Sequence, residues 1–192
     1  MANNVFVLAF DHPYQHGETI NFDAALVAGS DCLPLFWLAG CEPSNLKLLP
    51  CDVSAMSPAV RPNWVVGIPA LVGPVNHMLP LADRRLSSWS EQVHRMDQVA
   101  GQWLSFLDKH QGKHLLIHLN EYAEFTSARE CHAELSGLLP ALDNLNHPAI
   151  GKFLEGQQTG ASTLVKAGPA YSADDLALLV GHSWVSPVPW EK

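Results

Sequence analysis

The run from Asn4 to Phe10 constrains the fold of this chain more than any other feature. Six consecutive apolar side chains follow Asn4, and most of them are β-branched or aromatic. This composition over so few residues predicts a strand, and the unbroken apolarity predicts that both of its faces are buried. Pro13 limits the strand, because proline has no N–H for a sheet hydrogen bond. The run Leu115–Leu119 predicts a second buried strand near the middle of the chain.

Helical periodicity is strongest between Ser88 and His110. Apolar side chains recur in and beside this stretch at spacings of three and four, which places them on one face of a helix. They are Leu86, Trp89, Val93, Met96, Val99, Ala100, Trp103, Leu104 and Leu107. Gly112 ends this helix. A shorter helix is predicted from Pro74 to Arg85, interrupted by Pro80.

The first third of the chain predicts less regular structure. Residues 32–40 favour a short buried helix with a capping residue before it, and a core strand is the alternative. Four prolines then occur within residues 43–62. They predict a structured loop with short extended pieces such as Trp64–Ile68. Pro69, Gly73 and Pro74 predict further turns. Trp64 fits the pattern of a core residue. Three further tryptophans in the first two thirds of the chain do so too: Trp37, Trp89 and Trp103.

Two more helices are predicted towards the end of the chain. Residues 127–146 begin with Ser127 and carry Glu130 three positions later, which is a capping-box pattern, and Pro140 predicts a kink. Residues 151–168 are weakly patterned. A last helix opens at Ser172 and closes near residue 181.

These elements predict an α+β fold, with a small buried sheet packed with three to five helices. A length of 192 residues suits one compact domain, 1–192, with residues 185–192 as a loose or docked tail.

An excess of acidic residues limits the classes of partner that the chain can bind. There are 19 Asp and Glu against 11 Lys and Arg, a formal net charge of -8, although only 16% of residues are charged. Such a surface repels phosphate backbones and anionic membranes and attracts basic proteins. We therefore expect neither nucleic acid nor membrane as a direct partner. Oligomeric state is left open.

The expected compartment is the cytoplasm. No apolar stretch approaches the ~20 residues that span a bilayer, and the apolar run near the start is too short for a signal peptide. Cys32, Cys41, Cys51 and Cys131 form no CxxC pair and match no zinc-site spacing, so reduced thiols are expected.

Motif searches predict no catalytic residue, metal or cofactor. His110, His114 and His118 recur every four residues, but the last two lie on a predicted strand, about 13 Å apart, which is too far for one zinc ion. The signatures GxSxG, GxGxxG and GxxxxGK[ST] are absent from the sequence.

One alternative is enzymatic. Glu121 and Glu124 follow the second predicted strand, and the end of a buried strand is a frequent site of chemistry. With His118 they could form the acid–base pair of a small hydrolase. The other interpretation of these acids is a solvated loop or a helix cap.

A binding function is suggested by aromatic residues near the end of the chain. Trp184 and Trp190 are flanked by Pro and Ser, and aromatics at a partly exposed end can anchor interfaces. The other interpretation, that Trp184 packs the last helix, is the more common outcome for such a residue. Asp174 and Asp175 open that helix. An acidic surface with aromatic anchors would capture a basic partner rapidly.

Three segments together carry a resemblance to known proteins: Met1 to Leu8, Leu33 to Leu38, and Leu115 to Leu119 closing on Asn120-Glu121. They resemble a loosely defined group of uncharacterised bacterial cytoplasmic proteins, including proteins similar to immunity proteins of interbacterial toxin systems. The resemblance covers about the first two thirds of the chain and transfers no catalytic residue. It implies a protein that binds and neutralises a secreted toxin.

The function predicted from the sequence is therefore an immunity-type protein that blocks the active site of a cognate toxin. The acid surplus suits a basic toxin, such as a nuclease. The predicted contact residues are Glu121, Glu124, Asp174, Asp175 and Trp184. A non-catalytic structural or assembly subunit is a further alternative.

Overall fold

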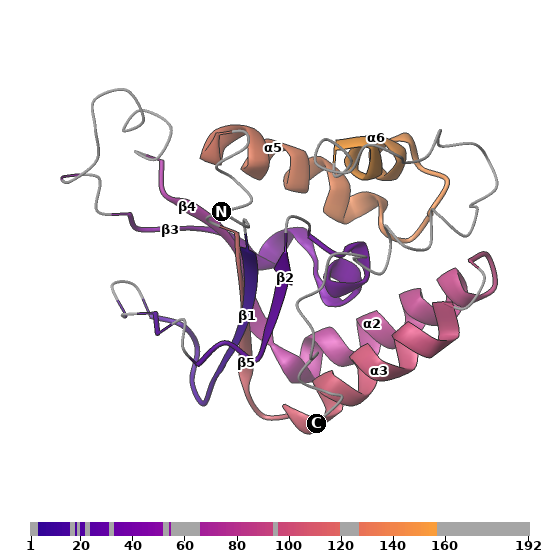
Figure 1. Ribbon diagram of the computed structural model, residues 1–192, viewed down its shortest axis with the longest axis horizontal. Coiled ribbons are helices and arrows are strands. Elements are labelled where there is room, and N and C mark those ends of the chain that lie inside the picture. Colours follow the sequence, from indigo (N-terminus) through magenta and orange to yellow (C-terminus); the bar gives the residue numbers. More distant parts are fainter. Residues whose placement is uncertain are drawn as a thin grey trace.

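The computed structural model describes residues 4–15, 18, 20–21, 24–30, 33–51, 54, 66–93, 96–119 and 127–156. Their main feature is one antiparallel sheet with helices packed on one of its faces, as Figure 1 shows. The predicted α+β class is confirmed. The predicted last helix, the tail at 185–192 and most of the extended piece at 64–68 lie outside the described residues.

The sheet has five strands in the order β2-β1-β5-β4-β3. Their bounds are β1 Asn4–Phe10, β2 Val27–Ser30, β3 Leu46–Leu49, β4 Ile68–Pro74 and β5 His114–His118. Every neighbouring pair runs antiparallel. The central strand is β5, so strands from the first and second quarters of the chain meet on either side of it.

The pairing register of the strands shows which side chains lie on each face of the sheet. Val7 pairs with Ile117, which pairs with Leu71, and all three belong to the main core beneath the helices. On the opposite face Leu8 pairs with Leu116, which pairs with Val72. These residues belong to a smaller apolar cluster. Because successive side chains alternate between faces, both faces of the central strands are apolar, as the sequence predicted.

The helical layer holds two pairs of α-helices. The first pair is α2, Val75–Ser90, and α3, Met96–Lys109, which lie side by side. The second is α5, Ala128–Leu138, and α6, Pro148–Gly156. The described residues also form three short 3-10 helices: η2 Leu35–Gly40, η3 Pro43–Asn45 and η4 Leu139–Ala141.

Both predicted strands are confirmed, the first with the same bounds and the second one residue earlier than predicted. The capping box is confirmed as well: the Ser127 hydroxyl accepts from Glu130 N at 3.2 Å, and Ser127 N donates to the Glu130 carboxylate at 2.9 Å. The helix it begins gives way to η4 just before Pro140, where the kink was predicted. The segment Leu35–Gly40 is a buried helix, in 3-10 form, and not a strand.

The prediction of one helix over residues 88–110 was wrong, because the chain turns between α2 and α3. Gln92 N and Val93 N both donate to the Trp89 carbonyl, and the Val93 side chain is buried at the turn. A straight helix of that length would extend about 35 Å, beyond strands that reach about 23 Å. The turn lets both apolar faces cover the same core.

Pro80 does not interrupt α2, which continues through it to Ser90. A proline at this position removes the hydrogen bond to the Asn76 carbonyl. Asn76 and Pro80 are both exposed, so solvent can replace the missing donor.

The prediction of turns at Pro69, Gly73 and Pro74 was also wrong, because all three lie in β4. Gly73 leaves room for the side-chain amide of Asn45, which would have to move if a Cβ atom were added there. That amide donates to the Val72 carbonyl at 3.0 Å. Strands β2 and β3 and helix α6 were not predicted.

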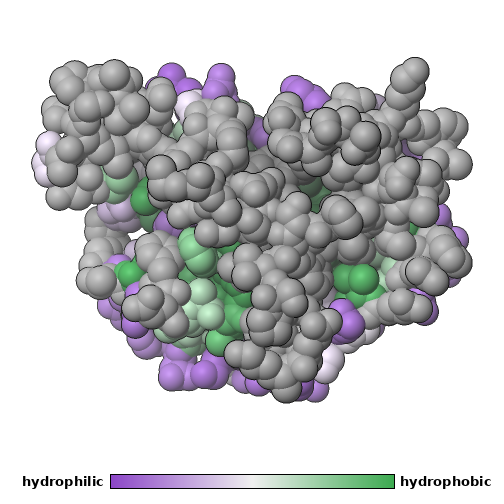
Figure 2. Space-filling model, viewed as in Figure 1, coloured by the Kyte–Doolittle hydropathy of each residue, from purple (hydrophilic) through white to green (hydrophobic). Residues whose placement is uncertain are grey.

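The core around the helices is aromatic. The rings of Trp37 and Trp103 are stacked with centroids 5.8 Å apart, and Trp103 stacks on Phe106 at 5.0 Å. Trp89 is buried nearby, so the prediction of core positions for these three tryptophans is confirmed. In the view of Figure 2, hydrophilic side chains lie along the lower outline and hydrophobic ones are set back between them. Within the described ranges, no helix has the length and apolarity to cross a membrane.

Candidate functional site

The predicted contact residues cannot be placed relative to one another. Glu121 and Glu124 lie between β5 and α5, and Asp174, Asp175 and Trp184 lie beyond α6, all outside the described residues. Their roles stay predictions.

His118 is the one residue of the predicted hydrolase site that the structure describes. It ends β5 on the face of the sheet opposite the described helices, between Phe6 and Ala70, and is 3% exposed. Burial lowers its pKa from 6.5 to about 4. A general base works best when its pKa lies near the operating pH, so His118 is poorly suited to that role near neutrality.

His114 lies on the same face, four residues earlier, between Phe10 and Pro74. Alternation along the strand places both histidines on this face, as predicted. Among the described residues, no group of three His, Cys, Asp or Glu side chains is arranged to hold a metal ion.

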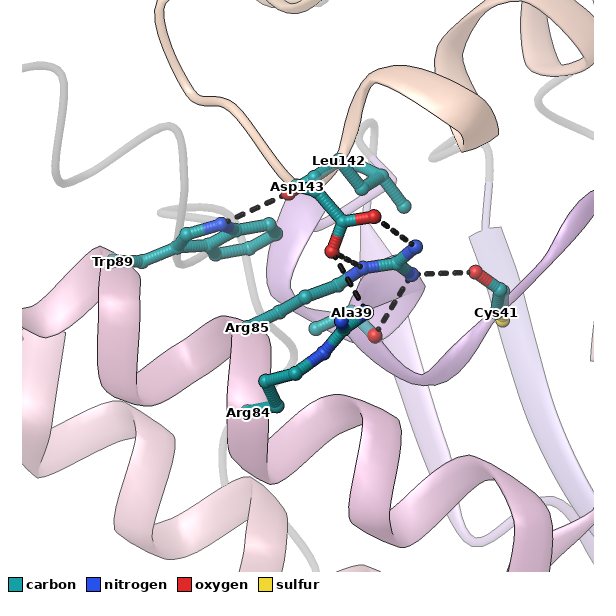
Figure 3. A network of polar contacts seen from close by, with 7 residues as sticks. All are labelled: Ala39, Cys41, Arg84, Arg85, Trp89, Leu142 and Asp143. Atoms are coloured by element: carbon teal, nitrogen blue, oxygen red, sulfur yellow. Dashed lines mark hydrogen bonds and ion pairs between the residues drawn. The ribbon is translucent and has the colours of Figure 1, made fainter.

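The densest polar network surrounds Arg85, which lies on the buried side of α2 and is 5% exposed (Figure 3). Its Nη1 donates to the Ala39 carbonyl at 3.1 Å and to the Cys41 carbonyl at 2.7 Å. Its Nε donates to Asp143 Oδ1 at 3.1 Å, and its Nη2 donates to Oδ2 at 3.4 Å. One guanidinium therefore joins α2, the end of η2 and the loop before α6.

Two neighbours on α2 extend this network. Arg84 donates to the same Asp143 oxygen at 3.0 Å from an exposed position, and Trp89 Nε1 donates to the Leu142 carbonyl at 3.1 Å. The Arg85 hydrogen bond, followed by the charges of both arginines, lowers the pKa of Asp143 and outweighs the opposing effect of burial. Every hydrogen bond of the network ends on a backbone carbonyl or on Asp143, so the network serves to join segments.

Sequence reasoning missed Arg85, although one signal was present. Met78, Ala82, Arg85 and Trp89 recur at spacings of four, three and four, so Arg85 occupies a position in the buried stripe of α2. A buried arginine at such a position requires several acceptors.

Acidic and small side chains are exposed on the outer side of α2 and α3. We call this outer side the hairpin surface. Its residues are Asp83, Ser87 and Glu91 at α2 and Asp97, Gly101, Ser105 and Asp108 on α3. All seven are exposed and four of them are acidic, while Arg84, Gln102 and Lys109 are exposed on the same helices.

Acids outnumber cations among the exposed residues described at α2 and α3. Within the described residues none of the four acids of the hairpin surface forms an ion pair, and Asp108 accepts a hydrogen bond from Gln111. Two exposed cations belong to the same helices, Arg84 and Lys109, and Arg84 is bonded to Asp143. The surface is therefore acidic and sterically open.

No protein-family model, curated protein or solved structure matches this chain.

Proposed function

We propose that this protein is an immunity-type protein that binds a basic bacterial toxin in the cytoplasm and blocks its active site or substrate entry. The observation that carries the proposal is the hairpin surface, where small side chains alternate along the helices with four acids that form no ion pair within the described residues. The acid surplus of the whole chain, a net charge of -8, supports the same kind of partner.

The packing of α2 and α3 supports a binding role for this surface. Their opposite sides carry Leu86, Trp89 and Trp103, all of which are buried. A surface fixed in this way loses little conformational entropy on binding, which favours affinity. Small side chains between the acids leave room for the long side chains of a partner.

The chemistry of the partner follows from charge. A toxin that acts on a polyanion, such as a nuclease, has cations along its substrate groove. Acidic groups on a rigid surface could occupy that groove in place of phosphates. Complementary charges would also speed association, and this effect weakens as salt rises.

The test is binding to the product of the neighbouring gene. The full chain is co-purified with that protein, and affinity is measured by titration calorimetry at low and at physiological salt. We expect a dissociation constant of micromolar or tighter. Failure to bind at that level would overturn the proposal, and self-association of the chain alone would favour an assembly subunit.

A matched pair of variants tests the surface itself. Ser105→Lys adds a cation at an exposed position on the hairpin surface, and Ala133→Lys adds one at an exposed position on α5. Repulsion of a basic partner should weaken binding of the first variant about tenfold or more and leave the second near the unmodified protein. Equal effects would place the interface elsewhere, and Trp184→Ala then tests the predicted anchor.

A further inference from the structure

We draw no further inference here: the strongest candidate, the half-exposed apolar patch around Phe6, Phe10 and Tyr14 on the face of the sheet that carries no helix, is unsupported because nothing in the described residues shows what covers it.

Discussion

Arg84 and Arg85 are adjacent on α2 and bond the same carboxylate of Asp143, yet their surroundings differ. The Arg84 side chain is 66% exposed, whereas that of Arg85 is 5% exposed. An ion pair in solvent contributes little to stability, because water and salt screen it. A buried guanidinium that also satisfies two carbonyls contributes more, since its loss leaves buried acceptors without a donor.

This difference predicts unequal effects of the same substitution at the two sites. Arg85→Met keeps an apolar stem but removes the donors to Ala39 and Cys41, and should lower the free energy of unfolding by about 3 kcal/mol. Arg84→Met should lower it by less than about 1 kcal/mol. Urea denaturation at pH 7 measures both. Similar losses would contradict the assigned role of Arg85.

The lowered pKa of His118 should make the stability of the protein depend on pH. Its pKa is about 4 in the folded protein against an ordinary 6.5, so between these values the unfolded chain binds more protons. The contribution to stability is fully present above pH 6.5 and is lost as pH falls towards 4. Between pH 7 and pH 5 the loss should be about 2 kcal/mol.

The comparison that isolates this effect is His118→Gln, which keeps polar atoms but does not titrate in this range. Urea midpoints at pH 7 and pH 5 should differ less in the variant than in the unmodified protein. An identical pH dependence in both would show that His118 does not carry the effect.

At the scale of elements, the sequence predicted the helices and strands whose formation depends on interactions between residues close together in the chain. The strand at residues 4–10 follows from composition alone, and the start of α5 follows from the reciprocal bonds of Ser127 and Glu130. Strand β4 could not be predicted, because its Gly73 is explained by a distant side chain, that of Asn45. The turn between α2 and α3 was missed because the apolar spacing continues across it.

Two glycines in helical segments should respond in opposite ways to alanine. At Gly101, on the exposed side of α3, an added Cβ meets no atom within 4 Å. Gly101→Ala should therefore raise the free energy of unfolding by about 0.5–1 kcal/mol, because alanine favours the helix.

At Gly40, in η2, an added Cβ would lie 2.9 Å from the Met78 carbonyl oxygen. Gly40→Ala should therefore destabilise the protein by about 1–3 kcal/mol, since backbone must move. Thermal melting of the two variants measures both effects. Destabilisation by Gly101→Ala would mean that α3 is constrained in a way its surroundings do not reveal.

At the scale of the whole molecule, the fold class was predictable and the site was not. A chain with two buried strands and periodic helices has few architectures that cover every apolar face. Binding surfaces follow no such rule, because exposed acids such as Asp83 and Asp97 have no local pattern that distinguishes them from ordinary solvated residues. The hairpin surface emerged only when α2 and α3 were placed side by side.

The rates at which the cysteine thiols react with an alkylating reagent test whether the core opens only when the whole protein unfolds. Cys41 and Cys131 are buried, and burial raises the pKa of each to about 12, with Arg85 opposing the rise at Cys41 and Glu134 adding to it at Cys131. Cys51 is half-buried. Because the thiolate is the reactive form, iodoacetamide at pH 8 should label Cys51 in the folded protein well before the other two.

Peptide mass spectrometry measures the labelling rates of Cys41, Cys51 and Cys131, and labelling in concentrated urea provides the reference in which these three thiols should react alike. Cys32, the fourth cysteine, lies outside the described residues. Labelling of Cys41 or Cys131 as fast as Cys51 under native conditions would mean that the core opens locally.

The central position of β5 in the sheet determines how much of the sheet can form while the chain is still being synthesised on the ribosome. Phe6 pairs with His118, and so does Ala70, so more than a hundred residues separate the first strand from β5, its partner at the centre of the sheet. A nascent chain that stops before residue 114 has made β1 and β4 but not the strand that joins them. Its two half-sheets, β1–β2 and β3–β4, each expose an unpaired strand edge beside apolar faces, which is the kind of surface that chaperones shield.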